Sequence, residues 1–140
     1  MDTVIAYTGG AARGNPGPAG IGVYIVEPGP TLVYEVGQTI GNSTTNFAEY
    51  QAVMVCLQSL IQLYSEATQT THFDIHLDSE LVKKQLNHES TITEPGLVPM
   101  FIEIHNLRVA SFPHLTLTLI SRTENKEVNR LVSEALDGKG

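Results

Sequence analysis

The sequence predicts an α/β fold in which helices flank a mixed five-stranded sheet. Three β-type segments separated by Gly- and Pro-rich turns come first, and two more follow, each reached through a segment of helical periodicity. Strands joined by short turns pair antiparallel, whereas strands joined through helices can pair in parallel. The chain has 140 residues, of which 41% are hydrophobic, so we expect a single domain spanning residues 1–140.

The first three strands are predicted at residues 3–8, 21–26 and 32–40, where β-tolerant side chains dominate. The run Gly9–Gly20 contains too many glycines and prolines for a helix or strand, and it is predicted to be a turn-rich connection. Pro28–Pro30 supplies the second turn. These segments predict an antiparallel meander.

The second half of the chain alternates helices and strands. A polar, cap-rich cluster at residues 42–46 precedes a long helix that starts near Asn46. Alternation predicts the fourth strand at residues 73–78, and Asp78 opens a helix that reaches Leu86. After the Glu94–Gly96 interruption, the pattern predicts a helix, a fifth strand and a closing helix at residues 97–111, 115–119 and 124–136.

Composition limits the classes of partner. The net charge of -7 repels a polyanion at long range, so nucleic-acid binding would require the eight Lys and Arg residues to gather on one face. No apolar run approaches the roughly 20 residues that cross a bilayer, and the N-terminus lacks a signal-peptide pattern. We expect a soluble, cytoplasmic monomer without a membrane partner. The single cysteine, Cys56, lies in an apolar helical stretch and is interpreted as a core residue.

Five motifs in this chain stand in the order and spacing of one enzyme family: Tyr7–Gly10, Gly14–Pro18, Thr44–Tyr50, Leu77–Val82 and Arg122–Leu131. Together they cover nearly the whole sequence, which resembles the type 1 ribonuclease H (ribonuclease HI) family throughout. The resemblance implies the ribonuclease H-like fold. It also implies an endonuclease that cuts the RNA strand of RNA–DNA hybrids with two magnesium ions held by four carboxylates.

Two of the four carboxylate positions are substituted. By resemblance, the first aspartate falls on Gly9 and the last on Asn129, whereas Glu49 and Asp78 retain their carboxylates. Two divalent ions about 4 Å apart clamp the scissile phosphate in such sites, and hard cations need oxygen ligands. The implied catalytic residues are therefore Glu49 and Asp78, and the implied metal ligands are these two together with Asn129.

Both surviving carboxylates also have structural explanations. Glu49 stands three residues after Asn46, the spacing of a capping box, and Asp78 could serve as the N-cap of the helix that follows it. In favour of a functional role, Glu49 shares a helical stripe with Val53 and Cys56, and a carboxylate on a buried stripe requires a cation.

No other acid is expected to replace the lost ligands. Glu127 and Glu80 each lie two residues from a site position, which on a helix places them on nearly the opposite face. Asn125 shares the face of Asn129 but adds no charge. Two carboxylates supply -2 against the +4 of two ions, so we expect at most one weakly bound Mg²⁺ or Mn²⁺ and cleavage near background.

The resemblance also implies a hybrid-binding surface. The loop after the first strand can present backbone groups and an amide to the minor groove, and the start of the long helix can hold a phosphate of the DNA strand. Capping is the competing role for the helix-start residues, and a solvated helix face is the competing role for the adjacent lysines. The expected contacts are Ala12, Arg13, Asn15, Thr44, Thr45, Asn46, Lys83 and Lys84.

Two features of some family members are missing. The segment Asn87–Pro95 is neither basic nor aromatic, so it lacks the basic protrusion, and Ser121–Thr123 contains no histidine. The five histidines show no paired metal-ligand spacing and are interpreted as surface or satisfied polar residues: His72, His76, His88, His105 and His114.

Three hypotheses follow. The first is a ribonuclease H scaffold that binds hybrids but is catalytically disabled, through natural divergence or deliberate substitution. The second is an active hybrid nuclease in which Glu49, Asp78, Asn129 and waters suffice for metal. The third is a protein-interaction module that kept the fold and lost nucleic-acid binding, which the acidic charge favours.

Overall fold

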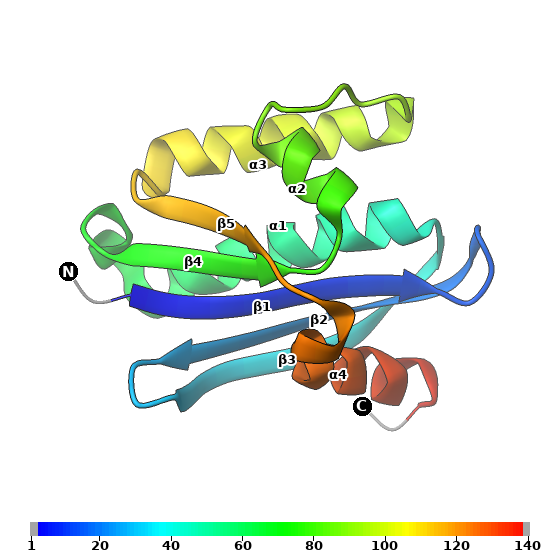
Figure 1. The fold of residues 1–140 in the computed structure, drawn as a ribbon, viewed down its shortest axis with the longest axis horizontal. Helices are drawn as coiled ribbons and strands as arrows, with labels where there is room; N and C mark the ends of the chain where they lie inside the picture. Colours follow the sequence, from blue (N-terminus) through cyan, green and yellow to red (C-terminus); the bar gives the residue numbers. More distant parts are fainter. Residues whose placement is uncertain (1–2, 139–140) are drawn as a thin grey trace.

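The computed structural model describes residues 3–138, which form a five-stranded sheet with helices on both faces (Figure 1). The strands and helices follow in the order β1 (Thr3–Ala12), β2 (Gly17–Glu27), β3 (Thr31–Ser43), α1 (Thr45–Tyr64), β4 (His72–Leu77), α2 (Glu80–Leu86), α3 (Val98–Ser111), β5 (Leu115–Leu119) and α4 (Lys126–Leu136), with short 3₁₀ turns at Ser65–Gln69, Pro95–Leu97 and Arg122–Asn125.

The sheet has the strand order β3-β2-β1-β4-β5. The first three strands pair antiparallel, whereas β4 pairs in parallel with both β1 and β5. The predicted mixed sheet, with a meander first and two strands added through helical crossovers, is therefore confirmed.

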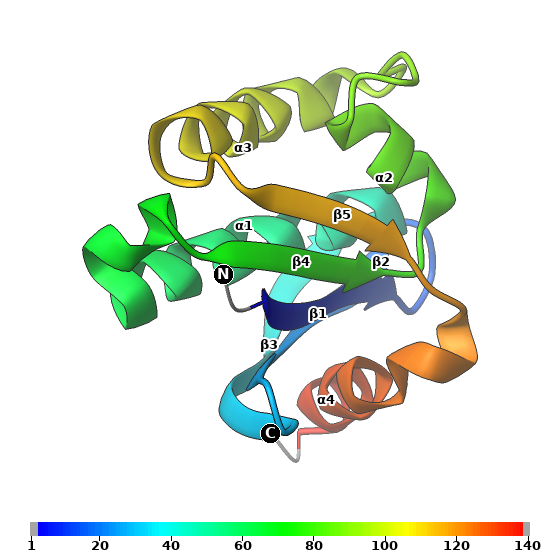
Figure 2. The ribbon, with the colours of Figure 1, turned by 60° about the vertical axis from the view of Figure 1, so that its left-hand side comes forward.

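Helices cover the two faces of the sheet unequally. Figure 2 shows α1, α2 and α3 on one side and α4 alone on the other. The main core lies between the sheet and α1, where Tyr50, Leu57, Phe73 and Ile75 are fully buried. α4 packs on β1, β2 and β3, and Val128 in its first turn lies against Gly9 of β1. Cys56 is fully buried, as predicted, and burial raises the pKa of its thiol to about 12.

The predicted turn over Gly9–Gly20 was wrong at both ends. β1 continues through Ala12 and β2 already begins at Gly17, because these residues pair across the two strands, with Gly9 opposite Gly22. Local propensity disfavours glycine in strands, but here close packing requires it. A Cβ on Gly10 would stand 2.5 Å from the backbone carbon of Ala48 in α1. The third strand is also longer than predicted and runs to Ser43.

Two helix starts also differ from the prediction. The N-cap of α1 is Thr44 rather than Asn46 or Thr45, and its hydroxyl accepts the backbone N–H of Phe47. The N-cap of α2 is Ser79, whose hydroxyl accepts the N–H of Val82. Capping therefore does not account for Asp78. In residues 3–138, no helix combines the length and hydrophobicity that crossing a bilayer requires.

Candidate active site

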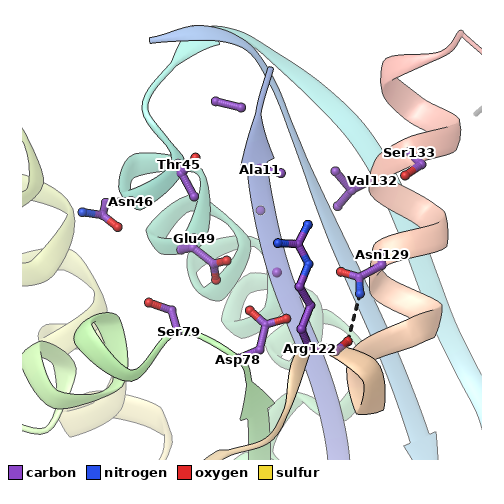
Figure 3. A pocket seen from close by; sticks show the side chains of 13 residues that line it. Ala11, Thr45, Asn46, Glu49, Asp78, Ser79, Arg122, Asn129, Val132 and Ser133 are labelled. Atoms are coloured by element: carbon purple, nitrogen blue, oxygen red, sulfur yellow. Dashed lines mark hydrogen bonds between the residues drawn. The ribbon is translucent and has the colours of Figure 1, made fainter. Parts of the chain in front are cut away.

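A cavity of about 400 Å³ opens between the ends of β1 and β4, the start of α1 and one face of α4 (Figure 3). The cavity lies where this chain brings strand ends and helix starts together, as ligand sites in α/β sheets commonly do. Its lining residues are Gly9, Gly10, Ala11, Ala12, Thr45, Asn46, Glu49, Asp78, Ser79, Arg122, Asn129, Val132 and Ser133.

All four positions implied by the resemblance line this cavity. β1 and β4 run in parallel with Tyr7 opposite His76, so Gly9 and Asp78, two residues further on, stand at the same level of neighbouring strands. Glu49 comes from the second turn of α1 and Asn129 from α4. The fold thus places two carboxylates, an amide and a glycine around one space.

Glu49 is buried, with 5% of its surface exposed, and its Oε2 has no hydrogen-bond partner. Burial and then the charge of Asp78 raise its pKa to about 8, against the opposing effects of the Gly10 N–H and the Arg122 guanidinium. The side chain is therefore turned toward β1 and the cavity. The capping-box explanation was wrong, because α1 begins one residue before Asn46 and its cap is Thr44.

Asp78 is held by an amide from the opposite wall. The Nδ2 of Asn125 donates to Asp78 Oδ2 at 3.2 Å and to the carbonyl oxygen of Thr8 at 3.0 Å. Asn125 is itself 1% exposed, and its Oδ1 has no partner. Asn125 therefore links β1, β4 and the turn before α4 beneath the floor of the cavity.

Arg122 supplies the positive charge of the cavity. Figure 3 shows its side chain extending between the two carboxylates and Asn129. The Nδ2 of Asn129 donates to the Arg122 carbonyl oxygen at 3.0 Å, which fixes the backbone that carries the guanidinium. Arg122 also lowers the pKa of Glu49, so the two opposite charges act on each other across the cavity.

The donor set around the cavity does not fit a pair of divalent ions. Its ionisable groups are Glu49, Asp78 and Arg122, whose formal charges sum to at most -1. Glu49 would also have to lose a proton near neutral pH before it could bind a cation. Across residues 3–138, no three His, Cys, Asp or Glu side chains are grouped so as to hold a metal.

The acids that were predicted not to substitute lie elsewhere. Glu127 accepts from Arg130 Nε at 3.1 Å, and Glu80 pairs with Lys84 at 3.0 Å. Neither lines the cavity. Asn125, predicted to share the face of Asn129, lies in a 3₁₀ turn, is buried and does not line the cavity.

Some of the predicted hybrid contacts lie together along one rim of the cavity. Ala12, Thr45 and Asn46 line the cavity, and Asn15 lies next to them because its Oδ1 accepts the backbone N–H of Thr45 at 3.0 Å. Thr44 is occupied as the N-cap of α1. The loop after β1 and the start of α1 are therefore joined directly.

Carboxylates already engage several of these donors. Asn46 Nδ2 donates to Glu94 Oε1 at 2.6 Å, and Arg13 pairs with Asp137 at 2.7 Å. Lys83 and Lys84 lie on α2 outside the cavity lining. Any phosphate that binds along this rim therefore competes with the protein's own acids.

The histidines are satisfied polar or surface residues, as interpreted. His72 lies between Thr3 and Thr116 hydroxyls, and His76 contacts Asp74 at 3.1 Å. The rings of His88 and His105 contact each other edge to face, with centroids 5.2 Å apart.

Two residues of the site, one in the cavity lining and one beneath it, were missed by sequence reasoning. Arg122 was considered only as part of a stretch that lacks a histidine, and Asn125 only as a residue that adds no charge. One signal was available for Arg122, because it is a cation within the last family motif of a chain with few cations. For Asn125, no sequence pattern separates an amide that bonds a strand carbonyl from one on a solvated face.

Comparison with known proteins gives consistent matches. The Reverse transcriptase-like family matches residues 7–135. Ribonuclease HI of Halobacterium salinarum is 37% identical over 96% of this chain and 64% of its own length. The Bifunctional protein Rv2228c of Mycobacterium tuberculosis is 30% identical over 98% of this chain and 36% of its own length. The chain thus spans less than two thirds of these relatives.

Three solved structures match over nearly their full length. LC11-RNase H1, isolated from compost, has a TM-score of 0.93 and 36% identity, covering 99% of this chain and 98% of that one. The same protein in complex with an RNA/DNA hybrid has a TM-score of 0.91 and covers 96% of this chain and 97% of that one. RNase H1 of Halobacterium salinarum has a TM-score of 0.88 and 34% identity, covering 97% and 98%.

Proposed function

Because this chain belongs to the type 1 ribonuclease H family, we propose that it binds RNA–DNA hybrids across the cavity but cleaves them far more slowly than a four-carboxylate relative. The observation that carries this proposal is the cavity itself. All four family positions line it, but only Glu49 and Asp78 are carboxylates.

Binding is supported by neutral donors and by one central cation. The rim formed by Ala12, Asn15 and the start of α1 offers backbone N–H groups, hydroxyls and amides, which contact phosphate and sugar without formal charge. Arg122 adds a guanidinium inside the cavity, where a phosphate oxygen would lie between it and the start of α1. Lys83 and Lys84 are proposed as further backbone contacts from α2.

The acidic protein should bind modestly and with a clear dependence on salt. Net charge of -7 opposes the approach of a polyanion, and each phosphate contact releases counterions. Fluorescence anisotropy with a labelled hybrid at low and moderate salt tests this, with double-stranded DNA as the competitor. Arg122→Gln should weaken binding about tenfold, while Lys126→Gln, outside the cavity, serves as the matched control.

Hybrid affinity that is no stronger than duplex DNA affinity, or that does not change with salt, would contradict the binding proposal. Such a result would favour the protein-interaction module, which the acidic charge also suits. If the Arg122 and Lys126 variants bind the hybrid with equal affinity, Arg122 does not contact it.

Slow cleavage follows from the missing charge. Losing one electrostatic stabiliser costs about 10²- to 10³-fold in rate, so losing two metal ligands should leave cleavage near background. The test is Mg²⁺-dependent cleavage of a labelled hybrid, with EDTA as the blank and Asp78→Asn as the matched inactive control. Robust turnover that Asp78→Asn abolishes would instead support an active nuclease that uses Glu49 and Asp78 with a reduced metal site.

A further inference from the structure

Gly9 belongs to a row of three glycines that crosses the sheet. It stands opposite Gly22 in β2, and Gly22 stands opposite Gly37 in β3. Glycine weakens a strand unless another backbone approaches closely. The three residues lie on neighbouring strands under the same helix, α4.

The helix backbone lies directly on two of these glycines. A Cβ on Gly37 would stand 2.5 Å from the carbonyl oxygen of Leu131, and a Cβ on Gly22 would stand 2.9 Å from the carbonyl oxygen of Val128. Both distances are shorter than side-chain contacts allow. α4 can therefore pack this close to the sheet only because β2 and β3 have glycines, and so no side chains, at these positions.

At Gly9 the space is filled by a side chain from α4. A Cβ at this position would stand 2.7 Å from Cγ1 of Val128 and 3.3 Å from Nδ2 of Asn125. Val128 is fully buried, and a β-branched residue in a helix has one strongly preferred rotamer. It is also packed over Gly22, where a Cβ would meet the same Cγ1 at 3.2 Å.

We infer that Val128 closes position 9 to any side chain, so that restoring carboxylates at positions 9 and 129 alone would not rebuild a metal site. This inference rests on the proposed loss of the metal site, and it adds a steric reason why a ligand side chain at position 9 does not fit. Between β1 and α4, the cavity wall is instead an apolar contact in which Val128 packs against Gly9. Gly9 is therefore a packing residue rather than an empty position.

A double-mutant cycle tests the steric part without any charge. Gly9→Ala adds only a methyl group, and overpacking of this kind should lower the melting temperature by about 5 °C. Val128→Ala alone should lower it by a similar amount, because a buried side chain is truncated. The Gly9→Ala/Val128→Ala pair should melt no lower than Val128→Ala, since the new methyl occupies the vacated space.

Gly96→Ala is the matched control, because a Cβ on Gly96 meets nothing within 4 Å. It should leave the melting temperature almost unchanged. If Gly9→Ala is as harmless as Gly96→Ala, or if the two single effects add in the pair, Val128 does not close position 9.

Metal binding provides the second readout. Mn²⁺ titration followed by electron paramagnetic resonance should find two ions in Gly9→Asp/Val128→Ala/Asn129→Asp. It should find at most one, bound at least tenfold more weakly, in Gly9→Asp/Asn129→Asp. Equal binding by the two variants would overturn the inference. Neither experiment uses a hybrid, so failure of the inference and failure of hybrid binding can be told apart.

Discussion

The cavity has two walls that differ in charge. The wall built from α1 and β4 retains both of its carboxylates, Glu49 and Asp78. The wall built from β1 and α4 carries Gly9 and Asn129 at the two positions where the family resemblance implies carboxylates. The two substitutions are 120 positions apart in the sequence but lie on elements that pack against each other.

This comparison indicates that the two walls differ in helix packing as well as in charge. On the first wall, the Asn125 amide holds Asp78 by a hydrogen bond, and Glu49 is buried with the Gly10 N–H lowering its pKa against the effect of burial. On the second, Val128 fills the space beside Gly9. Arg122 then stands between the walls as a fixed cation.

The largest effect is expected on the first wall, from the pH dependence of Glu49. Its pKa is about 8 in the folded protein against 4.5 ordinarily, so the folded state holds a proton that the unfolded state releases. The stability that the protonated Glu49 contributes is fully present below pH 4.5, the pKa of the unfolded state, and it is lost as the pH rises through about 8. It amounts to as much as a few kcal/mol. Glu49→Gln should remove this loss, so melting curves at pH 5 and pH 8.5 should differ less in the variant.

The control for that experiment is Glu66→Gln, an exposed acid in the turn after α1. It should retain the pH dependence of the unchanged protein. If Glu49→Gln retains it too, Glu49 is ionised at neutral pH and the first wall carries more negative charge than we infer.

A smaller effect should separate the two asparagines of the second wall. Asn125→Ala removes a buried amide that bonds Thr8 and Asp78, and it should lower the free energy of unfolding by about 2 kcal/mol. Asn129→Ala removes an exposed hydrogen bond to the Arg122 carbonyl and should cost about 0.5 kcal/mol. Chemical denaturation of both variants checks the ranking. Equal losses would mean that Asn125 does not link the walls.

The smallest effects are expected at the rims, where each wall carries one competing acid. Glu94→Gln removes the negative charge beside the Asn46 amide on the α1 side, and Asp137→Asn removes the charge that pairs with Arg13 on the α4 side. Each should tighten hybrid binding by about two- to fivefold and steepen its salt dependence. Glu66→Gln again serves as the control in anisotropy titrations. Unchanged affinity in one rim variant would place the hybrid away from that rim.

The sheet and the site positions could be predicted from the sequence because hydrophobic periodicity, turn residues and motif spacing depend on them directly. Alternation placed β4 and β5, and the family motifs placed Glu49 and Asp78 beside Gly9 and Asn129. The strand character of residues 9–12 could not be predicted, because partner strands and an overlying helix impose it against local propensity.

The packing of α4 on the sheet could not be predicted from the sequence either. The meaning of Gly9 depends on Val128, a residue that periodicity assigns to the core without saying what it covers. The cap residues were misassigned by one or two positions, since several polar residues compete at each helix start and only backbone geometry decides among them. Arg122 lies in a 3₁₀ turn, where no helical spacing points toward the cavity.

The most direct test of the two-wall account is a count of divalent ions in the unchanged protein bound to an RNA–DNA hybrid. Mn²⁺ titration of that complex, followed by electron paramagnetic resonance, should find at most one ion with a dissociation constant in the millimolar range. Two tightly bound ions between Glu49 and Asp78 would contradict the account.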